Sequence, residues 1–310
     1  MHPSNVLLPR IDAEKTPVDV DLPVFSKGPW SLCAPDAERS CFGCCPPIRP
    51  QGYDPLDWVA SLKREFQEHR KGFSHNALSP KPIIGFSCWA LGYLDEHGRI
   101  IGCLLHPARH AGRDLRYLTG YEEKCSGEFC LPARQFHSLK LPFQAFWLGL
   151  AAGLGSFYYA SPRANPLFHV LLWGAMVLEK LATFALAQGY SVTEIVYAYP
   201  FLTREGLSPR GHRFLMEAVL AHAHEPGLWN NAEIEAMAQK IHETVCAELS
   251  RVRVGLHGPD GLYVHRMGLG EAFADYLRLM HGLRQGNPQV IKHIKAKAVQ
   301  RAESLAGVAA

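Results

Sequence analysis

Three cysteines lie within five residues, in the run Cys41-Phe-Gly-Cys44-Cys45, and Pro-Pro-Ile-Arg-Pro follows directly. A thioredoxin-like C-x-x-C dithiol lies at the start of a helix, because the helix N-terminus lowers the pKa of its thiol. The prolines after Cys45 exclude a continuing helix, and no βαβ pattern precedes the run. This spacing therefore favours metal binding by thiolates over dithiol exchange.

The cysteines are concentrated in the first 130 residues, which hold eight of the nine, and only Cys246 lies beyond them. No charged segment followed by an apolar stretch opens the chain, so we expect a cytoplasmic, reducing compartment, where clustered cysteines bind metals more often than they form disulfides. Zinc and iron–sulfur clusters both take about four thiolates. The sequence predicts an iron–sulfur cluster, with 4Fe–4S favoured, or zinc, and the candidate ligands are Cys33, Cys41, Cys44, Cys45, Cys88, Cys103, Cys125 and Cys130.

The number of metal sites is left open by the spacing. Adjacent Cys44 and Cys45 point in different directions in most backbones, which favours two sites or one cysteine that is not a ligand. The pattern matches neither a zinc ribbon nor the bacterial ferredoxin run. The first candidates for ligands are Cys41, Cys44, Cys88 and Cys103.

A β-hairpin is predicted over residues 83–105, with its turn at residues 95–98, Asp-Glu-His-Gly. Pairing across this turn places Cys103 opposite Ala90 and diagonal to Cys88, on one face of the hairpin. Both thiols would then be within reach of one ion, and a register slip of one residue would undo this arrangement.

These residues resemble a family of zinc- or iron-chelating proteins that carry a C-x-x-C-x-x-C-C cluster. The resemblance rests on Cys41-Phe-Gly-Cys44-Cys45, on Cys88, and on Gly-Cys-Leu-Leu-His-Pro-Ala-Arg at residues 102–109, and it covers residues 33–130. It implies a metal, with an iron–sulfur cluster as one form, held by these thiols. The group includes the cysteine region of flagellin lysine methylases, so the resemblance also implies a role in modifying a protein.

The chain departs from that family pattern at three positions. Glu38 stands where the family has its first cysteine, His110 where it has proline, and Arg113 where it has its last cysteine. The spacing of Cys125 and Cys130 makes them candidate replacements. The departures put in doubt which thiols complete the ligand set.

The basic run at residues 106–116 has two interpretations, as a solvated loop or as the source of charges that offset an anionic cluster. In the second, Arg109, Arg113 and Arg116 lie near the thiolates and donate hydrogen bonds there. We expect His106 to be a packing or supporting group. Cys246, in the middle of a predicted helix, is expected to be a small buried apolar residue.

The predicted fold is mainly α, with an irregular cysteine-rich region that contains the short hairpin, over residues 1–138, followed by a helical domain over residues 139–310. Helical patterns with start and stop signals predict the second half to be mostly helical, with a second hairpin over residues 251–266. The predicted helices cover residues 54–72, 166–189, 208–224, 230–253, 269–284 and 287 onward.

Charge and hydropathy exclude some partners. The net charge of +3 is too small to predict a nucleic-acid partner. Residues 141–162 carry no charge and nearly reach the length of about 20 residues that spans a bilayer. Their glutamine, glycines and serines favour a buried helix, so we expect no membrane span.

Three hypotheses for function remain. In the first, the cluster supports modification or redox chemistry against the helical half, and in the second the chain is an electron-transfer module. In the alternative, a structural or regulatory zinc folds the cysteine-rich half, and the helical half binds a protein partner. The sequence does not determine whether the protein is an enzyme.

Overall fold

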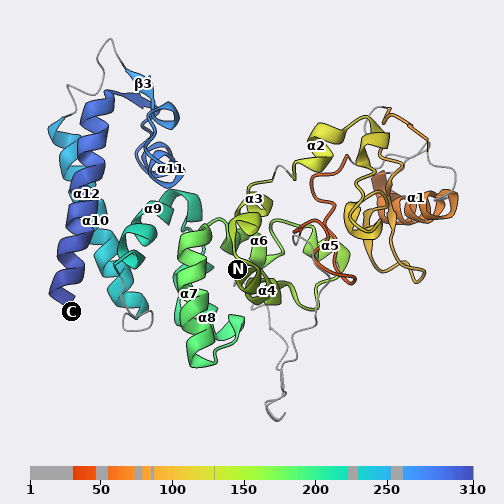
Figure 1. The fold of residues 1–310 in the computed structure, drawn as a ribbon, viewed down its shortest axis with the longest axis horizontal. Helices are drawn as coiled ribbons and strands as arrows, with labels where there is room; N and C mark the ends of the chain where they lie inside the picture. Colours follow the sequence, from red (N-terminus) through yellow and green to blue (C-terminus); the bar gives the residue numbers. More distant parts are fainter. Residues whose placement is uncertain are drawn as a thin grey trace.

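The structure, a computed structural model, describes residues 31–46, 55–73, 79–84, 87–128, 130–222, 230–252 and 261–309. These residues are mainly helical, as the sequence predicted. Along the longest axis of the molecule, α1 and the cysteine-rich segments lie toward one end, and α10 and α12 lie at the other (Figure 1). The cysteine-rich and C-terminal parts are thus well separated.

The described elements have the following bounds. The α-helices are α1 Trp58–Gly72, α2 Glu122–Ser126, α3 Leu131–Ser138, α4 Leu141–Leu148, α5 Ser156–Tyr159, α6 Pro166–Leu171, α7 Ala175–Gln188, α8 Val192–Ala198, α9 Pro209–Leu220, α10 Asn231–Arg251, α11 Glu271–Met280 and α12 Pro288–Ala309. The 3-10 helices are η1 Pro55–Asp57, η3 Pro107–Arg109, η4 Arg116–Thr119, η5 Gly149–Ala151, η6 Pro200–Leu202 and η7 Val264–Arg266. The strands are β1 Leu91–Tyr93, β2 Ile101–Cys103, β3 Leu262–Tyr263 and β4 Gln285–Gly286, and β1–β2 and β3–β4 are antiparallel pairs.

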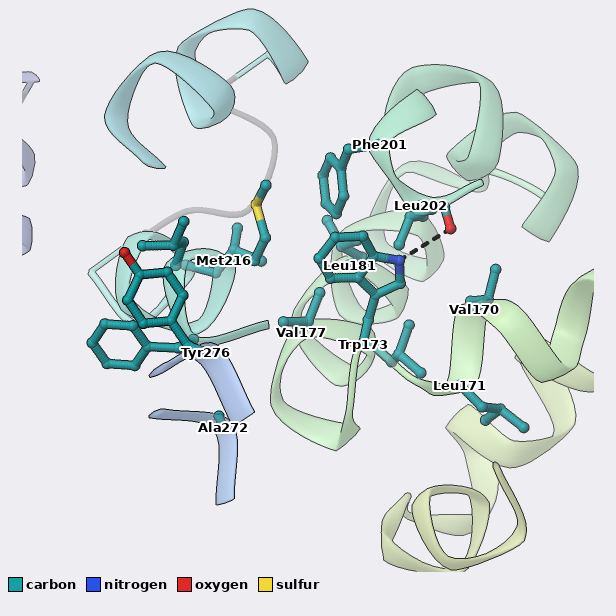
Figure 2. Close-up of a cluster of buried hydrophobic side chains, with 14 of the residues drawn as sticks. Val170, Leu171, Trp173, Val177, Leu181, Phe201, Leu202, Met216, Ala272 and Tyr276 are labelled. Atoms are coloured by element: carbon teal, nitrogen blue, oxygen red, sulfur yellow. Dashed lines mark hydrogen bonds between the residues drawn. The ribbon is translucent and has the colours of Figure 1, made fainter. Parts of the chain in front are cut away.

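Buried apolar side chains from α3 to α12 form one large cluster, which we call the helical core. Figure 2 shows its central part, where the Trp173 ring packs among Val177, Leu181 and Phe201. The Trp173 Nε1–H donates a 3.0 Å hydrogen bond to the Leu202 carbonyl (Figure 2). The large apolar ring is therefore buried without leaving its polar N–H unpaired.

A second, smaller buried cluster, which we call the hairpin core, lies beneath β1, β2 and α1. Phe66 of α1 packs its ring edge against Tyr93 of β1, with ring centroids 5.6 Å apart. Leu105, which follows β2, and Leu118 of η4 belong to the same buried set. Asp54, within the predicted first helix, lies outside the described residues; the described helical turns begin at Pro55.

The uncharged stretch at residues 141–162 folds as α4, η5 and α5 rather than as one helix. Gln144, its buried polar residue, donates from Nε2 to the carbonyls of Phe136 and Leu139 at 3.1 and 2.9 Å. These carbonyls lie at the end of α3, so the glutamine satisfies a helix C-terminus inside the core. Across the described residues, no helix combines the length and the apolar character needed to cross a membrane.

The predicted single helix over residues 166–189 is wrong, because the structure divides it into α6 and α7. Gly174 adopts a positive φ of 84° between the two helices, and the backbone changes direction there. The side chain of Arg213 occupies the space beside Gly174, so a Cβ atom at this position would lie 2.4 Å from Nε of Arg213.

The start signals of the later helices are confirmed. Ser208 caps α9 by accepting from the Gly211 N–H. Asn230 opens α10 with a capping box, in which its side chain and that of Glu233 accept each other's backbone N–H. Such caps satisfy N–H groups that have no partner inside the helix, and they fix where each helix begins.

The predicted register of the first hairpin is wrong by one residue. Cys103 lies opposite Leu91 rather than opposite Ala90. The cause is the turn, in which the Asp95 carboxylate accepts from the backbone N–H groups of Arg99 and Ile100, both at 2.8 Å. This side-chain turn lengthens the loop by one residue, and the Leu94 N–H bonds to the Ile100 carbonyl.

Only part of the second predicted hairpin can be compared, since residues 253–260 lie outside the described residues. The described strand β3 pairs with β4, which precedes α12, in the register Leu262 to Gly286 and Tyr263 to Gln285. This pairing joins the segment before α11 to the segment between α11 and α12.

Candidate metal centre

The segment that carries the cysteine run is fixed to the helical half by three contacts. Tyr159 of α5 donates a 2.9 Å hydrogen bond to the Leu32 carbonyl, and Nη1 of Arg39 donates to the Leu148 carbonyl at 2.9 Å. Gly43 packs so closely on α5 that a Cβ atom there would lie 2.5 Å from the Ala160 carbonyl oxygen. Residues 31–46, the first described segment, accordingly run beside α5 (Figure 1).

Four thiols form what we call the first cysteine group: Cys33, Cys41, Cys44 and Cys130. Cys33 interacts electrostatically with each of the other three, and so does Cys41. Cys130 interacts with Cys44, so every pair within the group is in electrostatic range. Cys130 is the N-cap of α3, and that helix therefore brings the fourth thiol to the run.

The remaining four candidate thiols form the second cysteine group: Cys45, Cys88, Cys103 and Cys125. Cys45 interacts with Cys103 and Cys88, and Cys103 interacts with Cys88 and Cys125. The groups are also within electrostatic range of each other, because Cys45 interacts with Cys41 and Cys44, and Cys125 interacts with Cys44. Cys88 also interacts with Cys125. The hairpin slip does not separate Cys88 from Cys103, because residues 88–91 form a turn, closed by the Leu91 N–H on the Cys88 carbonyl, and not a strand.

The two groups meet at the peptide bond between Cys44 and Cys45, and they pack on different cores. Cys41 and Cys130 pack against the helical core. In the second group, Cys88 belongs to the hairpin core, and Cys45 and Cys103 pack against it. We therefore assign the adjacent cysteines to two neighbouring groups of four thiols, with Cys44 in electrostatic range of both.

Backbone N–H groups point at several of the sulfurs. The Gly43 N–H donates to the Cys41 sulfur at 3.4 Å. Cys88 and Cys103 likewise accept from the residue two positions on, and Cys130 accepts from Ala133 in the first turn of α3. Hydrogen bonds of this kind favour the anionic form of sulfur, and they are also found on the sulfurs of iron–sulfur sites.

Burial opposes this effect and is the larger influence on the thiols. Burial, followed by the neighbouring thiols, raises the pKa of Cys41 and of Cys103 to about 12 despite the N–H donors. It raises the pKa of Cys88 to about 11. Burial also raises the pKa of Cys33, Cys45, Cys125 and Cys130. A bound cation is the partner that makes such buried sulfurs anionic at neutral pH.

No three of the sulfurs are as close together as the ligands of a single zinc ion. Zn–S bonds of about 2.3 Å in a tetrahedron put sulfurs about 3.8 Å apart. Among the described residues, which include all nine cysteines, no three thiol sulfurs lie within 4.8 Å of one another. In an iron–sulfur cluster each thiolate binds its own iron, so wider spacing suits that donor set better.

A buried carboxylate, Glu128, lies beside the first group and was missed by the sequence analysis. It accepts from Ser31 Oγ at 2.6 Å and from His137 Nε2 at 2.8 Å, and Nε2 of His106 lies 3.7 Å away. Burial alone would raise the pKa of Glu128, but these three partners together lower it. Glu128 therefore adds a negative charge beside Cys33, Cys41 and Cys130, and no local motif signals this.

The second group has a positive neighbour, Arg116, as the sequence suggested. Arg116 is buried, pairs with Asp114 through three of its hydrogen bonds, and interacts electrostatically with Cys103 and Cys125. Arg109 also interacts with Cys103. Arg113, the third predicted arginine, has an exposed side chain. The charge-offsetting interpretation thus fits Arg116 and Arg109.

The two histidines of the basic run have structural partners. His106 is buried, and its Nδ1 accepts from the Ala108 N–H at 3.2 Å. His110 donates from Nε2 to the Leu104 carbonyl at 2.8 Å. These contacts fit the prediction that His106 is a supporting group, in its case one that faces Glu128.

Cys246 has a different environment from the one predicted. Its sulfur lies 3.5 Å from Nε2 of His242, one helical turn earlier on α10, and it forms a compact set with His281. The signal in the sequence was the spacing His-x-x-x-Cys, because residues four apart share a helix face.

Comparison of the chain with family models, with curated proteins and with solved structures finds no match. The likeness of residues 33–130 to the cysteine-cluster family therefore stays a prediction. What supports a function for this chain is the arrangement of its own side chains.

Proposed function

We propose that the chain is an iron–sulfur protein that holds two clusters of the 4Fe–4S type, one in each cysteine group. Cys33, Cys41, Cys44 and Cys130 would bind the first, and Cys45, Cys88, Cys103 and Cys125 the second. Such clusters supply reversible one-electron transfer. The function that follows is redox, as an electron-transfer unit or as the electron-carrying part of an enzyme.

The division of eight thiols into two sets of four is the observation that carries this proposal. Each set matches the number of thiolates that one cluster needs. The sets adjoin at Cys44 and Cys45, so two bound clusters would be neighbours, which favours passage of an electron between them. The N–H groups directed at the sulfurs and the wide sulfur spacing support clusters over single zinc ions.

The protein supplies more than ligands in this proposal. Packing against two cores fixes each group separately, and burial limits the access of water to the sulfurs other than that of the exposed Cys44. Arg116 and Glu128 place opposite charges beside the two groups. The role in modifying a protein that the family resemblance implies has no further support and stays a prediction.

Purification without oxygen tests the proposal. The full chain should be brown and contain about eight iron and eight sulfide ions, two clusters of four each. Cys33→Ser and Cys103→Ser, one change in each group, should each remove about half of the iron. Cys246→Ser is the matched control and should keep all of it.

Other results would contradict specific parts of the proposal. A colourless protein with stoichiometric zinc would replace it with the structural zinc alternative. Iron for one cluster only, lost completely in both variants, would show that the two groups serve a single centre.

A further inference from the structure

A compact set of nitrogen and sulfur atoms lies at the opposite end of the molecule from the hairpin, where α10 meets the end of α11. His242 and Cys246 come from one face of α10, and His281 directly follows α11. One ligand atom from each residue lies within 4.8 Å of those from the other two. No other set of three in the described residues meets this criterion. Two helices therefore converge on one point with three metal-binding side chains.

The polar atoms of this set are arranged for a missing partner. The hydroxyl of Tyr276, a fully buried side chain of α11, forms a 2.8 Å hydrogen bond with Nδ1 of His242. The other ring nitrogen, Nε2, therefore faces Cys246. Nε2 of His281 is buried and accepts or donates no hydrogen bond to any described residue. A buried nitrogen without a partner is costly in a folded protein, and a bound ion would remove that cost.

We propose that His242, Cys246 and His281 form a binding site for one zinc ion or a closely similar divalent transition metal. Two imidazoles and one thiolate are a donor set that zinc accepts, with three protein ligands and a fourth position left to a small ligand. In a tetrahedral site, bonds of about 2.0 Å to nitrogen and 2.3 Å to sulfur put those two atoms about 3.5 Å apart. The separation between Nε2 of His242 and the Cys246 sulfur is 3.5 Å.

The surroundings supply the other features that such a site needs. Tyr276 orients His242 from the side away from the sulfur, which is the usual role of the group behind a metal-binding histidine. The rings of His242 and His281 stack with centroids 5.4 Å apart, and Tyr276 packs edge-on against His281. These ring contacts hold both imidazoles near each other before any ion binds.

An entry path also exists. His242 lines a cavity of about 240 Å³, whose other lining residues include His212, Glu235 and Gln239. The cavity gives an ion a route to His242, whereas Cys246 and His281 do not line it. This site is independent of the proposed clusters, because all its ligands belong to the C-terminal helices.

Zinc binding by the full chain, isolated with its iron, tests the proposal. The wild type should retain one zinc ion per chain that Cys246→Ser and His281→Ala do not retain after gel filtration, with affinity lowered at least about tenfold in each variant. His293→Ala removes an exposed histidine of α12 and should keep the zinc. Equal zinc content in the wild type and in both site variants would overturn the proposal.

A second measurement avoids any substitution. Alkylation of Cys246 in the wild-type chain, followed by mass spectrometry of its peptide, reports on that thiol alone. Saturating zinc should slow the reaction at least about tenfold, because a metal-bound thiolate is a poor nucleophile. An alkylation rate unchanged by zinc would show that Cys246 is not a ligand.

Discussion

Nη1 of Arg116 donates a 2.6 Å hydrogen bond to the carbonyl oxygen of Cys125. The guanidinium is thereby fixed beside the second cysteine group, with Asp114 on its other edge. The first group has the Glu128 carboxylate in the corresponding place. Two groups with identical donors therefore lie in different electric fields, and the field is one factor that sets the reduction potential of a bound cluster.

Neutralising Arg116 is expected to lower the reduction potential of one of the two proposed centres more than that of the other. Arg116→Gln removes a positive charge that favours the reduced, more negative state. Redox titration followed by electron paramagnetic resonance should show one potential shifted downward and the other shifted less, since Arg116 also interacts with Glu128 beside the first group. Arg116→Lys keeps the charge and should shift the potential less, and the exposed Arg113→Gln should leave both potentials in place. Equal shifts for Arg113→Gln and Arg116→Gln would contradict this role.

Neutralising Glu128 should act in the opposite direction and mainly on the other centre. Glu128→Gln removes a buried negative charge beside Cys33 and retains an amide that can bond Ser31. The same titration should show the potential of the first centre raised, and that of the second raised less. A change confined to the centre next to Arg116 would show that the two groups have been assigned to the wrong neighbours.

The sequence predicted which thiols are candidates, but it could not predict how they divide. Their concentration before residue 131 follows from residue type alone, so the sequence names all eight as candidates. Their grouping depends on α3, which brings Cys130 to the run, and on two separate cores. Glu128 was missed for the same reason, since Ser31, one of its partners, is 97 residues away in the chain.

A methyl group at Gly43 should remove the first cluster and leave the helical core folded. The Cβ atom of Gly43→Ala would lie 2.5 Å from the Ala160 carbonyl oxygen, so the run must move off α5 and take Cys41 and Cys44 with it. Iron analysis should show loss of about half of the metal, since one of two four-thiolate sets is disrupted. Thermal unfolding followed by circular dichroism should still show a cooperative helical transition.

Gly155→Ala is the matched control for that change. Gly155 lies directly before α5, has a negative φ of −67°, and would have nothing within 4 Å of an added Cβ atom. It should therefore keep the full iron content. Full iron content in Gly43→Ala as well would show that the close approach to Ala160 does not position the thiols.

Local chemistry explains which parts of the fold were predictable. The caps at Ser208 and Asn230 involve residues three positions apart, and the sequence located both helix starts. The hairpin register failed because the Asp95 side chain reaches two N–H groups and lengthens the turn. The 166–189 helix breaks at Gly174, which has a positive φ and over which Arg213 of the distant α9 packs, and the helical pattern of the sequence did not signal this break.

Alanine at the two glycines that flank α7 should separate backbone strain from the Arg213 contact. Gly174 at the start of α7 and Gly189 at its end have similar positive φ values, 84° and 71°. Each change to alanine should lower the free energy of unfolding by about 1–2 kcal/mol, because a Cβ atom disfavours this conformation.

Gly174→Ala should cost about 1 kcal/mol more, because its methyl group displaces Arg213, which donates a 2.7 Å hydrogen bond to Glu217. Nothing lies within 4 Å of a Cβ atom at Gly189, so Gly189→Ala carries the backbone cost alone. Denaturant unfolding of both variants measures the difference, and in the Arg213→Ala background the two changes should become equal. A difference that persists in that background would assign the extra cost to the backbone at Gly174 instead of to the side chain packed over it.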